Sequence, residues 1–315
     1  MDKNSNTKNL RLSVVIPVFN DEKVLPELIK RLIPSLEKIT NTFEVILIDD
    51  GSSDSSFTVM KEFKNRDSRL VLIKLTRNFG QSNAITAGLD IAQYEYIAIM
   101  DSDLQDPPEF IEKLLSACIS NDCDMAIAKR IQRKDSWFKR RVSVLFNKIT
   151  QFATTINVTP GLGVFRVIRK ASFDKIRLIP EVTGTTLSLL YWSGFDYITV
   201  DLERDARFAG NSGYTLRKMF SLAMDRIFSY SLWPLRLAIM CGTITALISF
   251  VLGIVVIYKR LFMSVSVPGW ASSIVLILFL FGINFIILGI VGEYIGRVFM
   301  ESKNRPKYII SKVIK

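Results

Sequence analysis

The stretch Tyr96-Ile97-Ala98-Ile99-Met100-Asp101-Ser102-Asp103 determines the fold prediction, because an apolar run stops there at two carboxylates. A short apolar run of this kind predicts a buried strand, which places both aspartates at its C-terminal end. Open α/β sheets bind their ligands outside the carboxyl ends of the strands. Two carboxylates one residue apart repel each other unless a cation lies between them, and their hard oxygen atoms suit Mg²⁺ or Mn²⁺ shared with substrate phosphates. A bare Asp-x-Asp also occurs on ordinary loops, so the rest of the chain has to support this interpretation.

Strand and helix patterns alternate upstream and downstream of that stretch. Apolar runs that predict strands lie at residues 12–19, 43–48, 70–75, 96–100 and 124–128. Helical patterns separate them and end at about residues 39, 66, 93 and 121. Such alternation is typical of βαβ units around a parallel sheet. The sequence therefore predicts an α/β domain.

A second acidic motif, Asp49-Asp50-Gly51-Ser52, follows the predicted strand at residues 43–48. Asp and Gly favour turns, so a plain turn explains this motif as well as a binding site does. In the functional interpretation, a carboxylate at the strand end accepts hydrogen bonds from a nucleobase or a ribose.

Composition excludes several classes of function. The chain has 315 residues, which allows one large domain with appendages or two domains. Its net charge of +11 is spread out, which favours attraction to anionic lipid head groups over nucleic acid, because no nucleic-acid-binding motif accompanies it. The chain has no histidine, so imidazole bases and histidine-ligated metals are excluded.

The cysteines and the N-terminus indicate a reducing compartment. Cys118, Cys123 and Cys241 have no metal-site spacing and are expected to be small buried apolar residues. Residues 1–11 are polar and contain no apolar signal-peptide core, so the first domain is expected to stay on the side where it is made.

Two long apolar segments, 235–258 and 270–291, predict a membrane hairpin. Each has about the ~20 residues that a bilayer requires, and this length disfavours a buried core helix. Basic residues are denser outside the hairpin than within its connection, which predicts that both termini are cytoplasmic. Two amphipathic basic stretches, 136–157 and 215–230, precede it. The first is expected either to lie in the membrane interface or to pack on the sheet, and the second to lie beside the membrane.

The motifs occur in the order of a known family. The chain resembles the family-2 glycosyltransferases with a GT-A fold, and within them the polyprenyl-phosphate glycosyltransferases of the bactoprenol glucosyltransferase and dolichyl-phosphate mannose synthase types. The long acidic motif is far more specific than Asp-x-Asp, and the resemblance covers nearly the whole chain because the bactoprenol type also ends in two spans. The stretches that carry it are Pro17-Val18-Phe19-Asn20, Asp49-Asp50-Gly51-Ser52-Ser53-Asp54, Asn78-Phe79-Gly80, Ala87-Gly88-Leu89 and Met100-Asp101-Ser102-Asp103-Leu104-Gln105-Asp106-Pro107-Pro108-Glu109.

The resemblance implies an architecture in four parts. Residues 1–214 would form a cytoplasmic GT-A domain, which is Rossmann-like with a mainly parallel sheet. Residues 215–230 would form a juxtamembrane amphipathic helix, 231–291 two transmembrane helices and 292–315 a basic cytoplasmic tail. The protein would be an integral membrane protein, with the bacterial inner membrane as its expected location.

The resemblance also implies roles for individual residues. Those expected at the nucleotide are Pro17, Phe19, Asn20, Asp49, Asp50 and Asp101. A Mg²⁺ or Mn²⁺ ion that bridges the donor diphosphate would be held by Asp101, Asp103 and Gln105. The lipid phosphate would be held by Arg130, one of Arg140 and Arg141, and Arg204 and Arg207 of a late Arg-x-x-Arg-x-x-Gly-x-Ser motif. Asp101, Asp103 and Arg207 would carry catalysis.

Two departures from the family pattern concern the acceptor side and the sugar. The family usually has acidic residues around its Gly-x-Phe-Arg segment, whereas this chain has Gly161-Leu162-Gly163-Val164-Phe165-Arg166 without a carboxylate. Position 129 is Lys where the family tends to have Gly.

The implied activity is a hexosyl transfer from a UDP- or GDP-linked sugar to undecaprenyl or dolichyl phosphate, with inversion at the anomeric carbon, of the kind used in cell envelope glycan modification. This chemistry is compatible with the lack of histidine, because a phosphate monoester has a second pKa of ~6 and attacks without a general base. A homo-oligomer and a neighbouring flippase are further partners to test. A processive polysaccharide synthase is disfavoured, since Gln-x-x-Arg-Trp is absent and the spans are too few. A catalytically inactive membrane scaffold that binds nucleotide or lipid is the alternative from another class.

Overall fold

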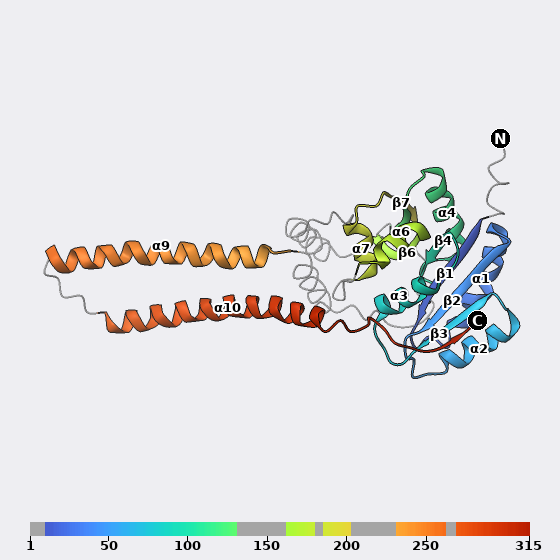
Figure 1. Cartoon of the computed structure of the whole chain (residues 1–315), viewed down its shortest axis with the longest axis horizontal. Coiled ribbons are helices and arrows are strands. Elements are labelled where there is room, and N and C mark those ends of the chain that lie inside the picture. The colour runs from blue at the N-terminus through green and yellow to red at the C-terminus, as the bar shows by residue number, and fades with distance from the viewer. Residues whose placement is uncertain (1–9, 131–161, 180–184, 203–230, 263–268) are drawn as a thin grey trace. The chain divides into compact units, whose positions relative to one another are not determined.

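The computed structural model describes residues 10–130, 162–179, 185–202, 231–262 and 269–315. The chain divides into two compact units, and each is described by itself (Figure 1). The described part of the first unit comprises residues 10–202, with the gaps just given, and 305–315. The described part of the second comprises residues 231–304, again with its gap.

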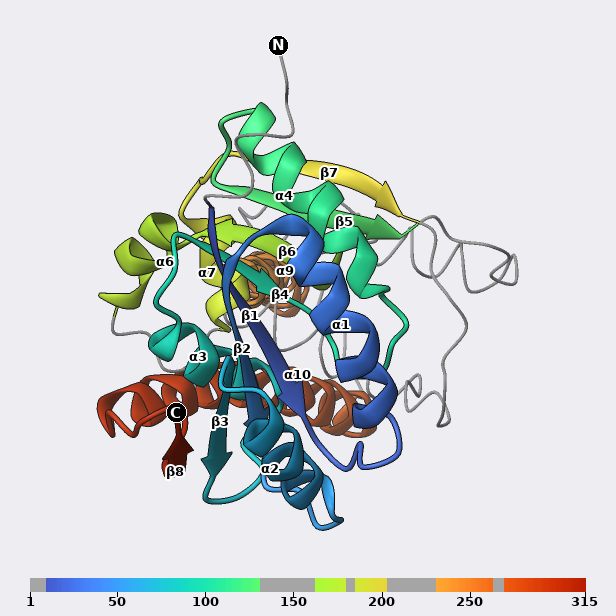
Figure 2. The same cartoon turned by 90° about the vertical axis from the view of Figure 1, so that its right-hand side faces the viewer.

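An eight-stranded mixed sheet organises the described part of the first unit (Figure 2). Its spatial order is β7-β5-β6-β4-β1-β2-β3-β8. The central strands β4, β1, β2 and β3 are mutually parallel, as are β5 and β7, while β6 and β8 run antiparallel to their neighbours. The predicted α/β fold with a mainly parallel sheet is confirmed. The strands are β1 (Arg11–Val18), β2 (Thr42–Asp49), β3 (Leu70–Leu75), β4 (Tyr96–Ile99), β5 (Met125–Arg130), β6 (Leu162–Arg169), β7 (Tyr197–Leu202) and β8 (Ile310–Ile314).

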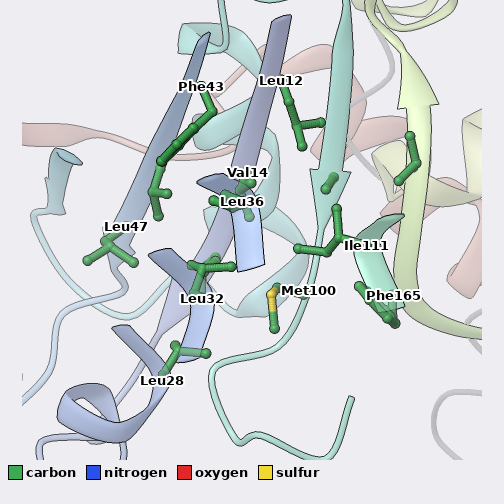
Figure 3. Packing of buried hydrophobic residues seen from close by; sticks show 14 of the residues in the cluster. Leu12, Val14, Leu28, Leu32, Leu36, Phe43, Leu47, Met100, Ile111 and Phe165 are labelled. Atoms are coloured by element: carbon green, nitrogen blue, oxygen red, sulfur yellow. The ribbon is translucent and has the colours of Figure 1, made fainter. Parts of the chain in front are cut away.

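Helices cover both faces of this sheet, so its central strands are apolar on both sides. One face packs against α1, α2 and α4, and the other against α3, α6 and α7. Figure 3 shows α1 leucines beside Leu12 and Val14 of β1 on the first of these faces. Each fully buried leucine stabilises the fold by roughly 1.5–3 kcal/mol. The helices are α1 (Leu25–Ile39), α2 (Ser56–Arg66), α3 (Gln81–Ile91), the 3₁₀ turn η1 (Pro108–Phe110), α4 (Ile111–Ser120), α6 (Lys170–Arg177) and α7 (Thr186–Trp192).

The C-terminal residues belong to the sheet, which changes the boundaries expected from the sequence. Strand β8 pairs antiparallel with β3 and covers an edge that would otherwise present unpaired backbone groups. The hydroxyl of Tyr308 donates to Asp90 Oδ2 at 2.6 Å, and the Thr76 backbone N–H donates to the Ile309 carbonyl at 3.0 Å. Residues 292–315 are therefore not a simple tail: the first part continues a helix and the last part completes the sheet.

Two long apolar helices dominate the described part of the second unit. They are α9 (Trp233–Phe262) and α10 (Trp270–Ser302), and the stretches Trp233–Val255 and Phe279–Ser302 have mean hydropathies of 2.3 and 1.8. Almost no residue of either stretch is buried within the protein, as expected of helices whose apolar surface faces lipid. Both are long and apolar enough to cross a membrane. Helix α10 extends beyond the predicted end at residue 291, because a helix need not stop where its apolar stretch meets polar residues.

Candidate active site

The carboxyl ends of β1, β2 and β4 meet at one edge of the sheet. Val18 pairs with Asp49 where β1 and β2 end, and Val15 pairs with Ile99 where β4 ends. Since the three strands are parallel neighbours, the loops that follow them gather at the same edge. The structure thus places three pairs of residues at this one edge: Phe19 and Asn20, Asp49 and Asp50, and Asp101 and Asp103. The sequence predicted this placement, because each pair lies at or just after the carboxyl end of a strand.

The Asp-x-Asp turn after β4 is held by several hydrogen bonds. The Gln81 side-chain amide donates to Asp101 Oδ1 at 2.5 Å, and the Gln105 backbone N–H donates to Asp103 Oδ1 at 3.1 Å. Leu104, between Asp103 and Gln105 in the sequence, has a φ of 58° and a buried side chain. A leucine in the left-handed region is strained and persists only where its surroundings hold it, which is common at functional sites.

A third carboxylate, Asp21, lies at this turn. The buried Ser102 hydroxyl donates to Asp21 Oδ2 at 2.5 Å, while the Asp21 backbone N–H donates to Ser56 Oγ at 2.9 Å. Burial raises the pKa of Asp21, and the negative charges of Asp103 and Asp54 raise it further. Asp21 is not among the residues predicted from the sequence, although it directly follows the Pro17-Val18-Phe19-Asn20 motif.

The donor set at this edge fits a divalent metal shared with a substrate. No group of three His, Cys, Asp or Glu residues is placed to hold a metal in the part of the chain that the structure describes. Asp101 and Asp103 supply two hard carboxylates, and a Mg²⁺-like ion commonly completes such a pair with substrate phosphate oxygens and water. The residues present therefore fit a metal that binds together with a diphosphate. The role of Gln105 as a third ligand stays a prediction, since Gln105 contacts Asp103 through its backbone N–H.

The two aspartates after β2 hold neighbouring loops. Asp50 accepts hydrogen bonds from the backbone N–H groups of Phe79 at 2.7 Å and Gly80 at 2.9 Å. Asp49 Oδ1 accepts from the Ser52 backbone N–H at 3.0 Å. Both carboxylates are buried; burial raises the pKa of Asp50, and its two backbone hydrogen bonds lower it in part. The motif is thus a structured turn in this state, and the predicted contact of either carboxylate with a nucleoside stays a prediction.

The loops after β1 and β2 are linked to each other. Asn20 Oδ1 accepts from the backbone N–H of Ser53 at 2.9 Å, and the Asn20 backbone N–H donates to Ser52 Oγ at 3.0 Å. Next to Asn20, the Phe19 side chain is 45% exposed. The exposed ring of Phe19 is compatible with the predicted contact of this residue with the nucleotide, which stays a prediction. Pro17 is buried within β1, and its predicted place at the nucleotide stays a prediction.

The segment that departs from the family pattern places a buried cation near Asp101. Residue Arg166 of β6 pairs with Ile99 of β4, two residues before Asp101. Its guanidinium donates to the carbonyls of Val164 at 3.0 Å and Gly163 at 2.6 Å and lies 5.4 Å from the centre of the Tyr191 ring. Burial lowers the pKa of Arg166, while Tyr191 and the negative charge of Asp101 oppose that shift. The sequence pattern predicts no role for Arg166.

Most of the predicted acceptor-side residues lie outside the described part of the chain. Arg130 is the last residue of β5 and pairs through its backbone with Leu202 of β7. The Arg130 side chain, both amphipathic stretches and Arg140, Arg141, Arg204 and Arg207 are outside the described residues. Lys129, the other departure, lies 3.9 Å from an Asp201 carboxylate oxygen and has 43% of its side chain exposed.

Comparisons with known proteins identify the family. The model of glycosyl transferase family 2 matches residues 13–177. The SfII prophage-derived bactoprenol glucosyl transferase of Shigella flexneri is 36% identical, with 96% of this chain and 98% of that protein covered. The undecaprenyl-phosphate 4-deoxy-4-formamido-L-arabinose transferase of Proteus mirabilis is 34% identical, with 96% and 94% covered.

A solved structure supports the fold independently. The mannosyltransferase PcManGT from Pyrobaculum calidifontis, in complex with GDP-Man and Mn²⁺, has a TM-score of 0.51 at 16% identity and covers 71% of this chain and 64% of its own. Two long apolar helices, together with relatives named for bactoprenol and for undecaprenyl phosphate, indicate membrane association. The family model, the nearly full-length relatives and the strand-end carboxylates agree, and the chain belongs to glycosyl transferase family 2.

Proposed function

We propose that this protein transfers one sugar from a nucleotide-sugar to a polyprenyl phosphate in the membrane and inverts the anomeric carbon. The observation that carries the proposal is the placement of Asp101 and Asp103 at the edge where β1, β2 and β4 end, in a chain that also has two long apolar helices. The names of relatives that match over nearly the whole chain support the acceptor class.

The donor side is supported by residues that the structure brings together. Phe19 presents an aromatic surface suited to a base, and Asp101 and Asp103 present carboxylates suited to a metal-bound diphosphate. A bound Mg²⁺ or Mn²⁺ would neutralise charge on the departing nucleoside diphosphate. The neighbour solved with GDP-Man and Mn²⁺ supports a divalent ion and a nucleotide-sugar donor for the fold.

The reaction follows from the chemistry of the two substrates. A lipid phosphate oxygen forms a bond to the anomeric carbon while the bond from that carbon to the diphosphate breaks, and the electron pair leaves with the nucleoside diphosphate. The acceptor is largely dianionic at neutral pH and needs no general base. The protein has to align both substrates and to place fixed cations between the lipid phosphate and the donor diphosphate. The groups proposed as these cations are Arg130, Arg140 or Arg141, Arg204 and Arg207.

The proposed location follows from the donor. Nucleotide-sugars are cytoplasmic, so the first unit is proposed to face the cytoplasm of a bacterial inner membrane, in agreement with the basic residues that flank the hairpin. A homo-oligomer and a neighbouring flippase remain proposed partners.

The test is a transfer assay with a defined acceptor. Purified protein with undecaprenyl phosphate receives radiolabelled UDP-glucose, UDP-galactose, UDP-N-acetylglucosamine and GDP-mannose in turn, and label is counted in the organic phase. We expect label from one donor, dependence on Mg²⁺ or Mn²⁺, and release of a nucleoside diphosphate. Label that appears instead in a water-soluble polymer would indicate a processive synthase. Nucleotide or lipid binding without transfer from any donor would indicate an inactive scaffold.

A further inference from the structure

Gln81 makes a contact with the proposed metal site that no motif predicts. It is the first residue of α3, and its side-chain amide donates to Asp101 Oδ1 at 2.5 Å across 20 residues of sequence. Carboxylates that bind metals are usually hydrogen-bonded by a second residue that fixes their orientation. The Gln81 amide occupies that position at Asp101.

The start of α3 that carries Gln81 is itself held in place. The buried Asp50 carboxylate accepts from the backbone N–H groups of Phe79 and Gly80, which directly precede Gln81. Further along the helix, a Cβ on Gly88 would lie 2.5 Å from Val15 Cγ1 and 2.7 Å from Ile48 Cδ1, so the α3 backbone lies tightly against β1 and β2. The position of Gln81 is therefore set by buried contacts, although its own side chain is exposed.

We propose that Gln81 is a positioning residue that orients the Asp101 carboxylate for a divalent metal, and that Asp50 acts on the same site through the loop that carries Gln81. The inference rests on the proposed function, because that function supplies the metal-bound diphosphate. It gives the Asp49-Asp50-Gly51-Ser52 motif a role at the metal in addition to any contact with a nucleoside.

The test measures metal binding with a ligand that has no sugar and no base. The full-length protein in detergent is titrated with Mn²⁺ in the presence of inorganic diphosphate, and free Mn²⁺ is measured by electron paramagnetic resonance. We expect Gln81→Ala to weaken Mn²⁺ binding about 10–100-fold, the usual effect of removing a residue that orients a metal ligand. Gln93→Ala is the matched control, since Gln93 is an exposed glutamine just beyond the other end of α3. This control should bind Mn²⁺ as the parent does.

The same titration separates positioning from direct contact with the substrate. If Gln81 instead touches the donor sugar or the base, Gln81→Ala will slow transfer and leave the affinity for Mn²⁺ with diphosphate at the parent value, and that result overturns the proposal. A parent protein that binds no Mn²⁺ refutes the metal-dependent function as well, so the two failures are distinguishable.

A double-variant cycle tests the role of Asp50. Asparagine at position 50 keeps the shape of the side chain but retains only one acceptor for the two N–H groups. We expect Asp50→Asn to weaken Mn²⁺ binding in the parent and to add little in the Gln81→Ala background, because both changes act through the same amide. Equal losses in both backgrounds would show that Asp50 does not act through Gln81. Thermal unfolding of each variant shows whether the fold is kept, and Gln81→Ala alone tests the first half of the proposal if Asp50→Asn fails to fold.

Discussion

Replacing Gly51 by alanine tests how strictly the turn after β2 depends on its backbone. Gly51 has φ of +70°, and a Cβ built on it would lie 2.5 Å from the Arg77 carbonyl carbon and 2.6 Å from the Asn78 nitrogen. Carbon atoms pack best at about 3.5–4.0 Å, so the methyl group would be at least about 1 Å too close. Both contacted atoms belong to the backbone, and no side-chain rotation relieves the overlap.

Two costs add in this variant. A left-handed backbone costs a residue other than glycine about 1–2 kcal/mol, and overpacking of a well-filled site costs typically about 1–3 kcal/mol. We therefore expect Gly51→Ala to lower the free energy of unfolding by about 2–5 kcal/mol. The overlap also pushes the loop that leads to Gln81, and a displacement of about 1 Å at a catalytic site commonly reduces the rate about 100-fold.

Gly194→Ala is the matched control for the dihedral cost. Gly194 has φ of +71°, but a Cβ there would meet nothing within 4 Å. Chemical denaturation in detergent and the kcat/KM for transfer are measured on both variants. We expect Gly194→Ala to lose only about 1–2 kcal/mol and to keep the parent rate. The reasoning is refuted if Gly51→Ala is as stable as Gly194→Ala and transfers sugar at the parent rate.

The remaining predictions concern the metal, the lipid phosphate, the topology and the buried thiols. Asp103→Asn removes one hard anionic ligand and is expected to abolish transfer, as chelation of the metal should in the parent protein, whereas the control Asp174→Asn on α6 should retain transfer. Transfer by Asp103→Asn, or by the parent protein in the presence of chelator, would contradict the metal assignment. Arg207→Ala is expected to slow transfer at least ~100-fold with nucleotide affinity little changed by calorimetry, and a large loss of that affinity would move Arg207 to the donor side. A reporter fused after Lys315 should behave as cytoplasmic and one inserted near Ser264 as external, and the opposite pattern would overturn the proposed location. Burial raises the pKa of the Cys118 thiol to about 12, so Cys118 should resist alkylation at pH 8 in the folded protein and react after unfolding, which mass spectrometry of the labelled peptide will show.

The local pattern of the sequence was sufficient to predict the central sheet and its helices. Strands β1 to β5 appear as apolar runs because both faces of the sheet are covered, and the helices between them show one apolar side. The position of Asp101 and Asp103 at a strand end follows from the same pattern. The two apolar helices were predictable for the same reason, since apolar length is a property of a continuous segment.

Contacts between distant parts of the chain were not predictable from these patterns. The hydrogen bond from Tyr308 to Asp90 joins residues 218 positions apart, and with strand β8 it places the C-terminus in the sheet. The roles of Gln81 and Asp21 beside the Asp-x-Asp turn depend on which loops the strand order brings to one edge.

The sequence by itself thus determined the fold class, the apolar helices and the edge at which the acidic motifs gather, because hydrophobic periodicity reports burial within each segment. Only the tertiary structure decided which partner each polar side chain has. Asp50 illustrates the difference. Its sequence position suggests a ligand contact or a turn, whereas in the structure both Asp50 oxygens accept hydrogen bonds from the loop before α3, against which Gly51 packs closely. A buried carboxylate needs hydrogen-bond donors, and the strand order, which local periodicity does not contain, determines which donors lie within reach.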